Sequence, residues 1–249
     1  MQIPTGNLDA IRDGIRAVLD PLTPAADTRP AADGAAGDLV LLARAFDQLM
    51  DVMERIEADS RVEGGTHTPH SSTAGDISEL GEYALKLLDN LAAHLNEAAA
   101  REHNAGLAAN FAVWIARHGG QIDTLAPVAD ALALLANRLT DPRDLEALNA
   151  IMAEISNAVS PVIREDLERI NPGRPWRVLL LNRSIVATRS HNTAVMEEAF
   201  AFLTHYLPED AARFFTEGMQ QMDALDYPAQ VRKVMEKYHR LWTLNRSLH

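Results

Sequence analysis

The 249-residue sequence predicts an all-α protein, either an irregular multi-helix bundle or a short α-solenoid, of about nine or ten helices. Apolar residues recur every three or four positions through most of the chain, which is the spacing of one helix face. Prolines and short polar residues stand at the starts of these segments, where they favour helix N-termini. A hydrophobic content of 47% supplies enough apolar surface for a sizeable core.

The first predicted helix covers residues 7–20, with Asn7 as its N-cap and Pro21 at its end. Residues 21–37 follow with three prolines and two glycines among small residues. Such a composition is typical of a linker, because it combines helix-breaking residues with little apolar surface. Residues 1–37 are therefore predicted to form an N-terminal helix plus a Pro/Ala-rich linker.

Residues 38–170 are predicted to form a helical region that opens with a long antiparallel hairpin. Its first arm begins at Asp38, and its second arm, running from Ile77 to roughly Arg101, is expected to be the longest helix. Residues 60–76 are expected to be a mobile tip between the arms, because they offer almost no apolar burial. Further helix starts are expected at Asn104, Leu125, Asp141-Pro142 and Ser160-Pro161.

Residues 171–249 are predicted to be a C-terminal helical module, after the Pro- and Gly-containing break at 171–175. The segment 176–189 also suits a buried strand, but its helical neighbours favour a helix. Three helix-length patterns follow, starting near Asn192, Pro208 and Pro228. Their apolar stripes predict that the last helix buries Trp242 against the two helices before it.

A weak internal similarity keeps both architectures open. Residues 131–139 and 199–207 share a pattern of alternating alanines and large apolar residues, and each precedes a helix start marked by proline and acidic residues. Stacked helical hairpins of a solenoid would repeat in this way. Any leucine-rich pair of helices can mimic such a repeat, so the irregular bundle remains the other prediction.

Composition limits the classes of function. The sequence has no cysteine, which removes disulfides, thiolate zinc sites and cysteine nucleophiles. A net charge of −12 argues against nucleic-acid binding, which needs a cationic surface. The apolar runs are too short to span a membrane, and the N-terminal segment does not resemble a signal peptide. We therefore expect no nucleic-acid partner, no membrane partner and a cytoplasmic location.

Candidate catalytic and metal-binding residues are few. No phosphate-binding glycine loop, nucleophile elbow or H-E-x-x-H motif occurs, so no catalytic residue and no cofactor is predicted. Glu236 and His239 form the one E-x-x-H pair, whereas a di-iron bundle needs two such pairs and further glutamates. His67 and His70 lie in the predicted tip and would need ligands from elsewhere. All four residues are expected to be ordinary solvated side chains.

The C-terminal module holds the candidate partner-binding residues. Phe202 falls off the apolar stripe of its helix, so it either meets a third neighbour or is exposed for a partner. The last helix carries a basic face that either docks on the acidic remainder of the protein or binds an acidic partner. The basic residues of this face are Arg232, Lys233, Lys237 and Arg240.

These features predict a soluble helical scaffold or adaptor that acts through contacts with a protein partner or a second copy of itself. One alternative is a metal-dependent helical-bundle enzyme with carboxylate and histidine ligands. The other is a small-molecule-binding regulatory protein with a pocket between helices.

Overall fold

A computed structural model describes residues 2–22, 35–62, 71–95 and 97–244. Within these ranges the chain forms eleven helices and no strand, which confirms the all-α prediction. The helices belong to two compact units. The first unit comprises residues 1–131 and 157–160, and the second comprises residues 132–156 and 161–249. The predicted division into 1–37, 38–170 and 171–249 stays a prediction.

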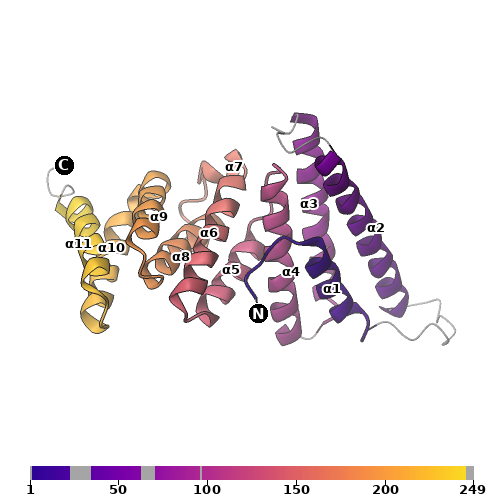
Figure 1. Cartoon of the computed structure of the whole chain (residues 1–249), viewed down its shortest axis with the longest axis horizontal. Coiled ribbons are helices and arrows are strands. Elements are labelled where there is room, and N and C mark those ends of the chain that lie inside the picture. The colour runs from indigo at the N-terminus through magenta and orange to yellow at the C-terminus, as the bar shows by residue number, and fades with distance from the viewer. Residues whose placement is uncertain (1, 23–34, 63–70, 96, 245–249) are drawn as a thin grey trace. The chain divides into compact units, whose positions relative to one another are not determined.

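The first unit is built on four helices that pack side by side (Figure 1). Helix α1 contacts α2 and α4, while α3 lies against α2 and α4. The predicted cap at Asn7 is confirmed, because its side chain accepts a hydrogen bond from the backbone N–H of Ala10 at 3.1 Å. The four helices are α1 (Leu8–Leu19), α2 (Ala35–Val62), α3 (Ser71–Ala92) and α4 (Glu97–Arg117).

The predicted extent of the hairpin's second arm is wrong. Helix α3 ends at Ala92 and has 22 residues, whereas α2 has 28. The chain then turns and α4 begins at Glu97, so Asn104 lies inside a helix instead of capping one. The turn brings α4 back onto α3, where Asn104 donates to the carbonyl of Leu88 at 3.0 Å. The fold-back buries apolar residues of both helices, and this burial is lost in one continuous helix.

The predicted tip is partly wrong as well. Residues 60–62 belong to the end of α2, and residues 71–76 form the first turns of α3. The tip candidates His67 and His70 lie outside the described residues.

Gly81 is a position where α3 lies close to a side chain of α4. A Cβ atom added there would overlap Ile115 Cδ1 and lie 2.7 Å from Ile115 Cγ1. We expect Gly81→Ala to lower the free energy of unfolding by roughly 1–3 kcal/mol, because overpacking outweighs the better helix propensity of alanine. Gly106→Ala on α4 is the matched control, because no atom lies within 4 Å of its added Cβ. Thermal unfolding of both variants checks this, and a stabilised Gly81→Ala would contradict it.

The second unit contains the C-terminal helices, and most of their predicted starts are confirmed. The segment 176–189 is helical, and Asn192 caps the following helix by accepting from the N–H groups of Ala194 and Val195. Asp141 accepts a hydrogen bond from the N–H of Arg143 at 2.8 Å. The helices are α5 (Ala126–Arg138) and α6 (Pro142–Ala158), which both carry residues of the two units, and α7 (Pro161–Arg164), α8 (Pro175–Arg189), α9 (Thr193–Tyr206), α10 (Pro208–Ala224) and α11 (Ala229–Leu244).

Helices α9, α10 and α11 enclose an aromatic core centred on Phe200. The ring of Phe200 packs edge-on against Phe215 and Tyr238, with ring centroids 5.1 and 5.2 Å apart. Most residues of the predicted stripes are buried in this core. The stripe of α11 ends earlier than predicted, however, because Leu241 is exposed and Trp242 is only half-buried at the margin of the core.

Candidate functional site

The segment between α7 and α8 has an unusual, closely held conformation. The sequence predicts a helix restart at Pro161, but α7 has only four residues and ends at Arg164. Asp166 then adopts a left-handed backbone with φ of 52°, which an α-helix cannot contain. Its buried carboxylate accepts two hydrogen bonds from the guanidinium of Arg174, one of them 2.7 Å long. This ion pair closes residues 166–174 into a compact loop.

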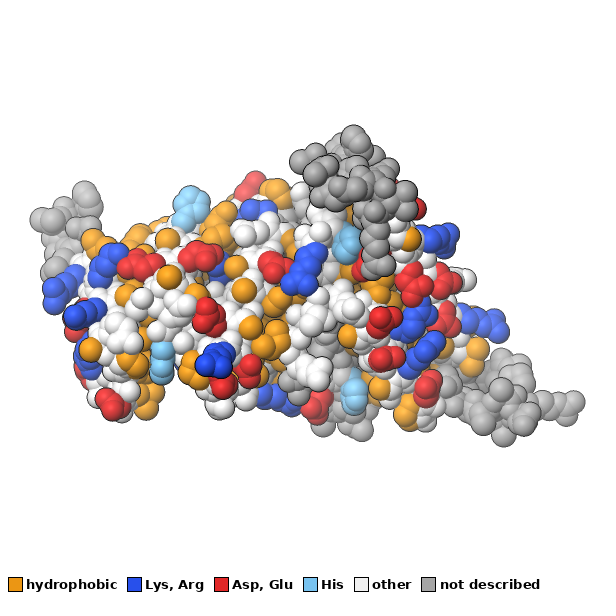
Figure 2. All heavy atoms as spheres, in the orientation of Figure 1, with side chains coloured by type: hydrophobic (Ala, Val, Ile, Leu, Met, Phe, Trp, Pro, Cys, Tyr) orange, Lys and Arg blue, Asp and Glu red, His pale blue; other side chains and the backbone are white. Residues whose placement is uncertain are grey.

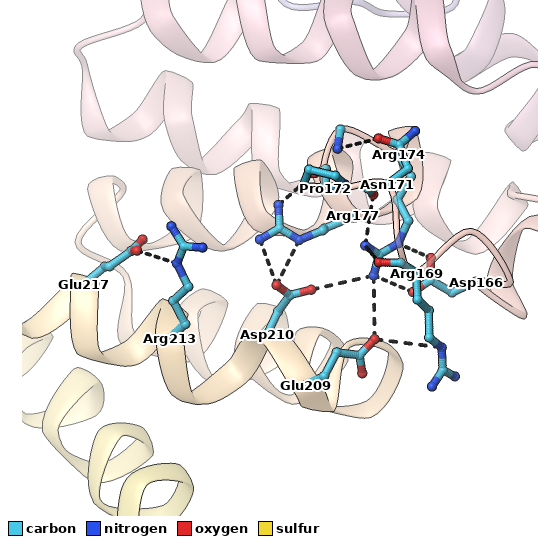
Figure 3. A network of polar contacts seen from close by, with 11 residues as sticks. Asp166, Arg169, Asn171, Pro172, Arg174, Arg177, Glu209, Asp210, Arg213 and Glu217 are labelled. Atoms are coloured by element: carbon cyan, nitrogen blue, oxygen red, sulfur yellow. Dashed lines mark hydrogen bonds and ion pairs between the residues drawn. The ribbon is translucent and has the colours of Figure 1, made fainter.

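Two arginines donate hydrogen bonds to backbone carbonyl oxygens of this loop (Figure 3). Arg174 donates to the carbonyl oxygens of Arg169 and Asn171, both at 3.2 Å. Arg177, in the first turn of α8, donates to the carbonyl oxygen of Pro172 at 2.9 Å. Because each donor is a planar guanidinium, these contacts constrain the direction of the loop backbone as well as its distance.

The same arginines connect the loop to the N-terminus of α10. Arg177 forms an ion pair with Asp210 at 2.7 Å, and Arg174 lies 3.6 Å from Glu209 and 3.7 Å from Asp210. Both carboxylates stand in the first turn of α10, where the helix dipole favours negative charge. The hydrogen bonds that Arg174 donates to Asp166, together with the negative charges of Asp166, Asp210 and Glu209, raise the pKa of Arg174 against the opposing effect of burial.

The loop and the short helix α7 before it present apolar side chains to solvent. Val162, Leu167 and Ile170 are 71%, 79% and 100% exposed, and we refer to these three residues as the loop patch. Exposed single apolar residues are common on proteins, but three within nine residues are a marked concentration along the chain. Figure 2 shows hydrophobic, acidic and basic side chains next to one another at the upper edge near α7. The loop patch is therefore the strongest candidate contact surface of the second unit.

A small pocket lies between α8, α10 and α11. It has a volume of about 210 Å³, and Gly218 and Met235 form part of its lining. A Cβ atom on Gly218 would lie 2.6 Å from Met235 Sδ, so glycine permits the close approach of α10 and α11 here. The remaining apolar side chains of the lining belong to Ile185, Phe214, Met222 and Tyr227.

The predicted basic face of α11 makes ion pairs within the second unit. Arg232 contacts Asp223 at 2.9 Å, and Lys237 contacts Glu197 at 2.8 Å. Arg240 lies 3.9 Å from Glu236 on its own helix, and Lys233 is exposed without an ion-pair partner among the described residues. Lysine and arginine side chains gather over α11 in Figure 2. A role of these four residues in partner binding stays a prediction.

The Glu197 carboxylate links α9 to α11 in a pH-dependent way. Hydrogen bonds from Lys237 and Tyr238 hold the pKa of Glu197 below its ordinary value of 4.5, against the opposing effect of burial. A lowered carboxylate pKa stabilises the fold above the unfolded pKa, and this contribution is lost as pH falls through the folded pKa. The wild-type protein should thus exceed Glu197→Gln in stability near neutral pH and lose this advantage below about pH 4.5.

The effect should be below about 1 kcal/mol, because Lys237 and Glu197 are both partly exposed. Thermal unfolding of the two proteins across the acidic range measures this difference in stability, and a constant difference at every pH would contradict the assignment.

The pKa of Tyr238, by contrast, lies in the alkaline range. Burial, followed by the contact with Glu197, raises the pKa of Tyr238 to about 12.

Phe202 meets a third neighbour, as one of the two predicted alternatives states. Its ring lies 6.2 Å from that of Trp176, edge to face, and the guanidinium carbon of Arg183 stands 4.9 Å above it. Arg183 is buried, and burial lowers its pKa despite the ion pair with Glu198. Phe202 remains half-buried, so its role as a partner-binding residue stays a prediction.

Glu236 and His239, the metal-ligand candidates within the described residues, are not brought together with other possible ligands there. Glu236 faces Arg240 on α11, and His239 is half-buried on the same helix. Among the described residues, no cluster of three or more His, Cys, Asp or Glu side chains suits a metal ion. In the described part of the chain, no helix has both the length and the apolar character needed to cross a membrane.

Comparison with known proteins adds no relative: no protein-family model, curated protein or solved structure matches the chain.

The loop patch and its buried ion pair were not predicted from the sequence. The sequence predicts a helix that restarts at Pro161, and in such a helix Leu167 and Ile170 would lie three positions apart on one face. The one local sign of a different structure is the concentration of prolines, asparagine and glycine in 171–175.

Proposed function

We propose that this protein is a helical scaffold or adaptor, and that its second unit binds a partner protein through the loop patch. The observation that supports this proposal is the combination of exposed apolar side chains with a rigidly held backbone. A surface that is ordered before binding loses little conformational entropy when a partner docks, so more of the contact energy appears as affinity.

The energetics of the loop favour a binding role over a purely structural one. Leu167 and Ile170 contribute almost nothing to the core, because they are 79% and 100% exposed. A buried ion pair such as Asp166–Arg174 is costly to desolvate and is weak support for stability alone. Its evident effect is to define one conformation of the loop, and loops held by a rigid scaffold are frequent sites of recognition.

The proposal is tested by site-specific photo-crosslinking in the cells that naturally make the protein. p-Benzoylphenylalanine placed at position 170 should yield a discrete crosslinked protein, because its side chain lies at the centre of the proposed contact. Adding Leu167→Asp should reduce that product by roughly tenfold, since a carboxylate would be buried against an apolar partner surface.

Position 241 provides the matched control for the crosslinker. Leu241 is also an exposed apolar residue of the second unit, at 49% exposure, but it lies on α11 outside the loop patch. Circular dichroism should show that all variants keep their helix content and thermal midpoint, as expected for exposed substitutions. Equal crosslinking from positions 170 and 241, or a product that Leu167→Asp leaves unchanged, would refute the proposal.

The pocket between α8, α10 and α11 supports a second candidate function, a regulator that binds a small apolar molecule. At about 210 Å³ it is smaller than most drug-sized ligand sites and suits a fragment-sized ring. NMR spectra of protein with ¹³C-labelled methionine methyl groups, titrated with indole and with phenol, test this candidate. Saturable shifts of Met222 and Met235 support it, and unchanged methyl signals of both residues exclude these ligands.

A further inference from the structure

We infer that the partner of the loop patch carries an apolar recess bordered by lysine or arginine side chains. This inference rests on the proposed function and concerns the chemistry of the same surface. The observations that support it are the charged residues next to Leu167 and Ile170, and which of these residues form ion pairs.

Two carboxylates stand beside the apolar side chains of the loop. Glu165 precedes Leu167 by two residues, Glu168 follows it directly, and both are exposed. Neither has an ion-pair partner among the described residues. The third acidic residue of the loop, Asp166, is buried and fully engaged with Arg174, so it adds no charge to the contact surface.

The basic residues near the loop are Arg164, Arg169 and Arg174, and none of them forms an ion pair with Glu165 or Glu168. Arg174 is buried and faces Asp166, Glu209 and Asp210. Arg169 is exposed, but its guanidinium lies 3.9 Å from Glu209 (Figure 3). The carboxylates of Glu165 and Glu168 therefore border the apolar side chains and take part in none of the ion pairs of this segment. A complementary partner surface places cations at its rim and apolar groups at its centre.

A second copy of this chain fits the surface less well than a cationic partner does. A symmetric contact through the loop patch would bring the Glu165 and Glu168 pairs of two chains together. Like charges across an interface are unfavourable, and the chain as a whole carries a net charge of −12. The charge pattern thus opposes self-association through this face and favours a partner of opposite charge.

The test uses the full-length chain with p-benzoylphenylalanine at position 170, irradiated in lysate of its native cells. Three forms are compared: the unchanged loop, Glu165→Gln with Glu168→Gln, and Glu165→Lys with Glu168→Lys. Each is measured at about 0.05 M and about 0.3 M NaCl, because added salt screens contacts at the rim of an interface. The glutamine form is the matched control, since it removes the charges with little change in side-chain size.

We expect the crosslinked product of the unchanged loop to fall by about threefold or more at the higher salt concentration. The glutamine form should give a similarly reduced product and little salt dependence, and the lysine form should give almost none. Circular dichroism is expected to be the same for all three forms.

Other results would overturn the inference in distinguishable ways. A product that is indifferent to salt and to both substitutions would retain the proposed function and exclude a cationic rim. A stronger product with the lysine form would indicate an acidic partner, and a crosslink between two copies of this chain would indicate self-association. A crosslink no stronger than that from position 241 would refute the proposed function and the inference together.

Discussion

Replacing Phe200 with alanine is expected to lower the free energy of unfolding of the second unit by roughly 3–5 kcal/mol. The Phe200 side chain is fully buried and is the common neighbour of three other rings in the core. Its truncation removes the edge-to-face contacts with Phe214, Phe215 and Tyr238 and leaves a cavity between α9, α10 and α11. Urea unfolding followed by circular dichroism measures the change.

Trp242→Ala is the informative comparison, because the sequence predicts that Trp242 is buried as deeply as the phenylalanines. The structure places this side chain half-buried at the margin of the same core. Its truncation should therefore cost clearly less than the loss of Phe200, since little of a cavity can form at an open edge. Equal losses for the two variants would show that α11 packs more deeply than described.

Replacing Asp166 with alanine is expected to destabilise the second unit by roughly 3–5 kcal/mol, the usual cost of leaving one partner of a buried ion pair uncompensated. Of its carboxylate partners, Arg174 would retain Glu209 and Asp210, at the longer distances of 3.6 and 3.7 Å. Alanine is also strained at the left-handed φ of 52°. The loop should then open, so that trypsin cleaves after Arg169 much faster than in the wild-type protein.

Two further variants separate charge from backbone conformation. Asp166→Asn keeps an oxygen acceptor and tolerates a left-handed backbone, so its loss of stability should lie between those of wild type and Asp166→Ala. Asp166→Ala combined with Arg174→Met should recover part of the loss, because no buried charge remains unpaired. The recovery is partial, since Arg174 also holds two loop carbonyls. Wild-type stability and trypsin resistance in Asp166→Ala would contradict the role of the ion pair.

Several local features of the fold are predictable from the sequence because their causes act within a few residues. Asn7 and Asn192 cap helices by hydrogen bonds to N–H groups two or three positions ahead. Pro208 begins α10 because its ring suits the first helical position and lacks the N–H that the interior requires. Helical spacing likewise identifies Phe200 and Phe215 as core residues before any partner helix is known.

The turn between α3 and α4 could not be predicted in this way. Residues 92–96 contain neither proline nor glycine, and the surrounding alanines and leucines favour a continuous helix. The chain turns because α4 packs back on α3, which buries Leu91 of α3 and Leu107 of α4. Intrinsic helix propensity changes by tenths of a kilocalorie per residue, whereas the burial of one leucine contributes about 2 kcal/mol.

The sequence by itself thus determined the helical class, most helix starts and the aromatic core, since spacing and capping are local properties of the chain. The tertiary structure alone decided that Leu167 and Ile170 face solvent. In a continued helix they would share one face, but Asp166 leaves the helical conformation and binds Arg174, which also lies near carboxylates on α10. The direction of the loop patch therefore depends on charges more than thirty positions away, which no local pattern contains.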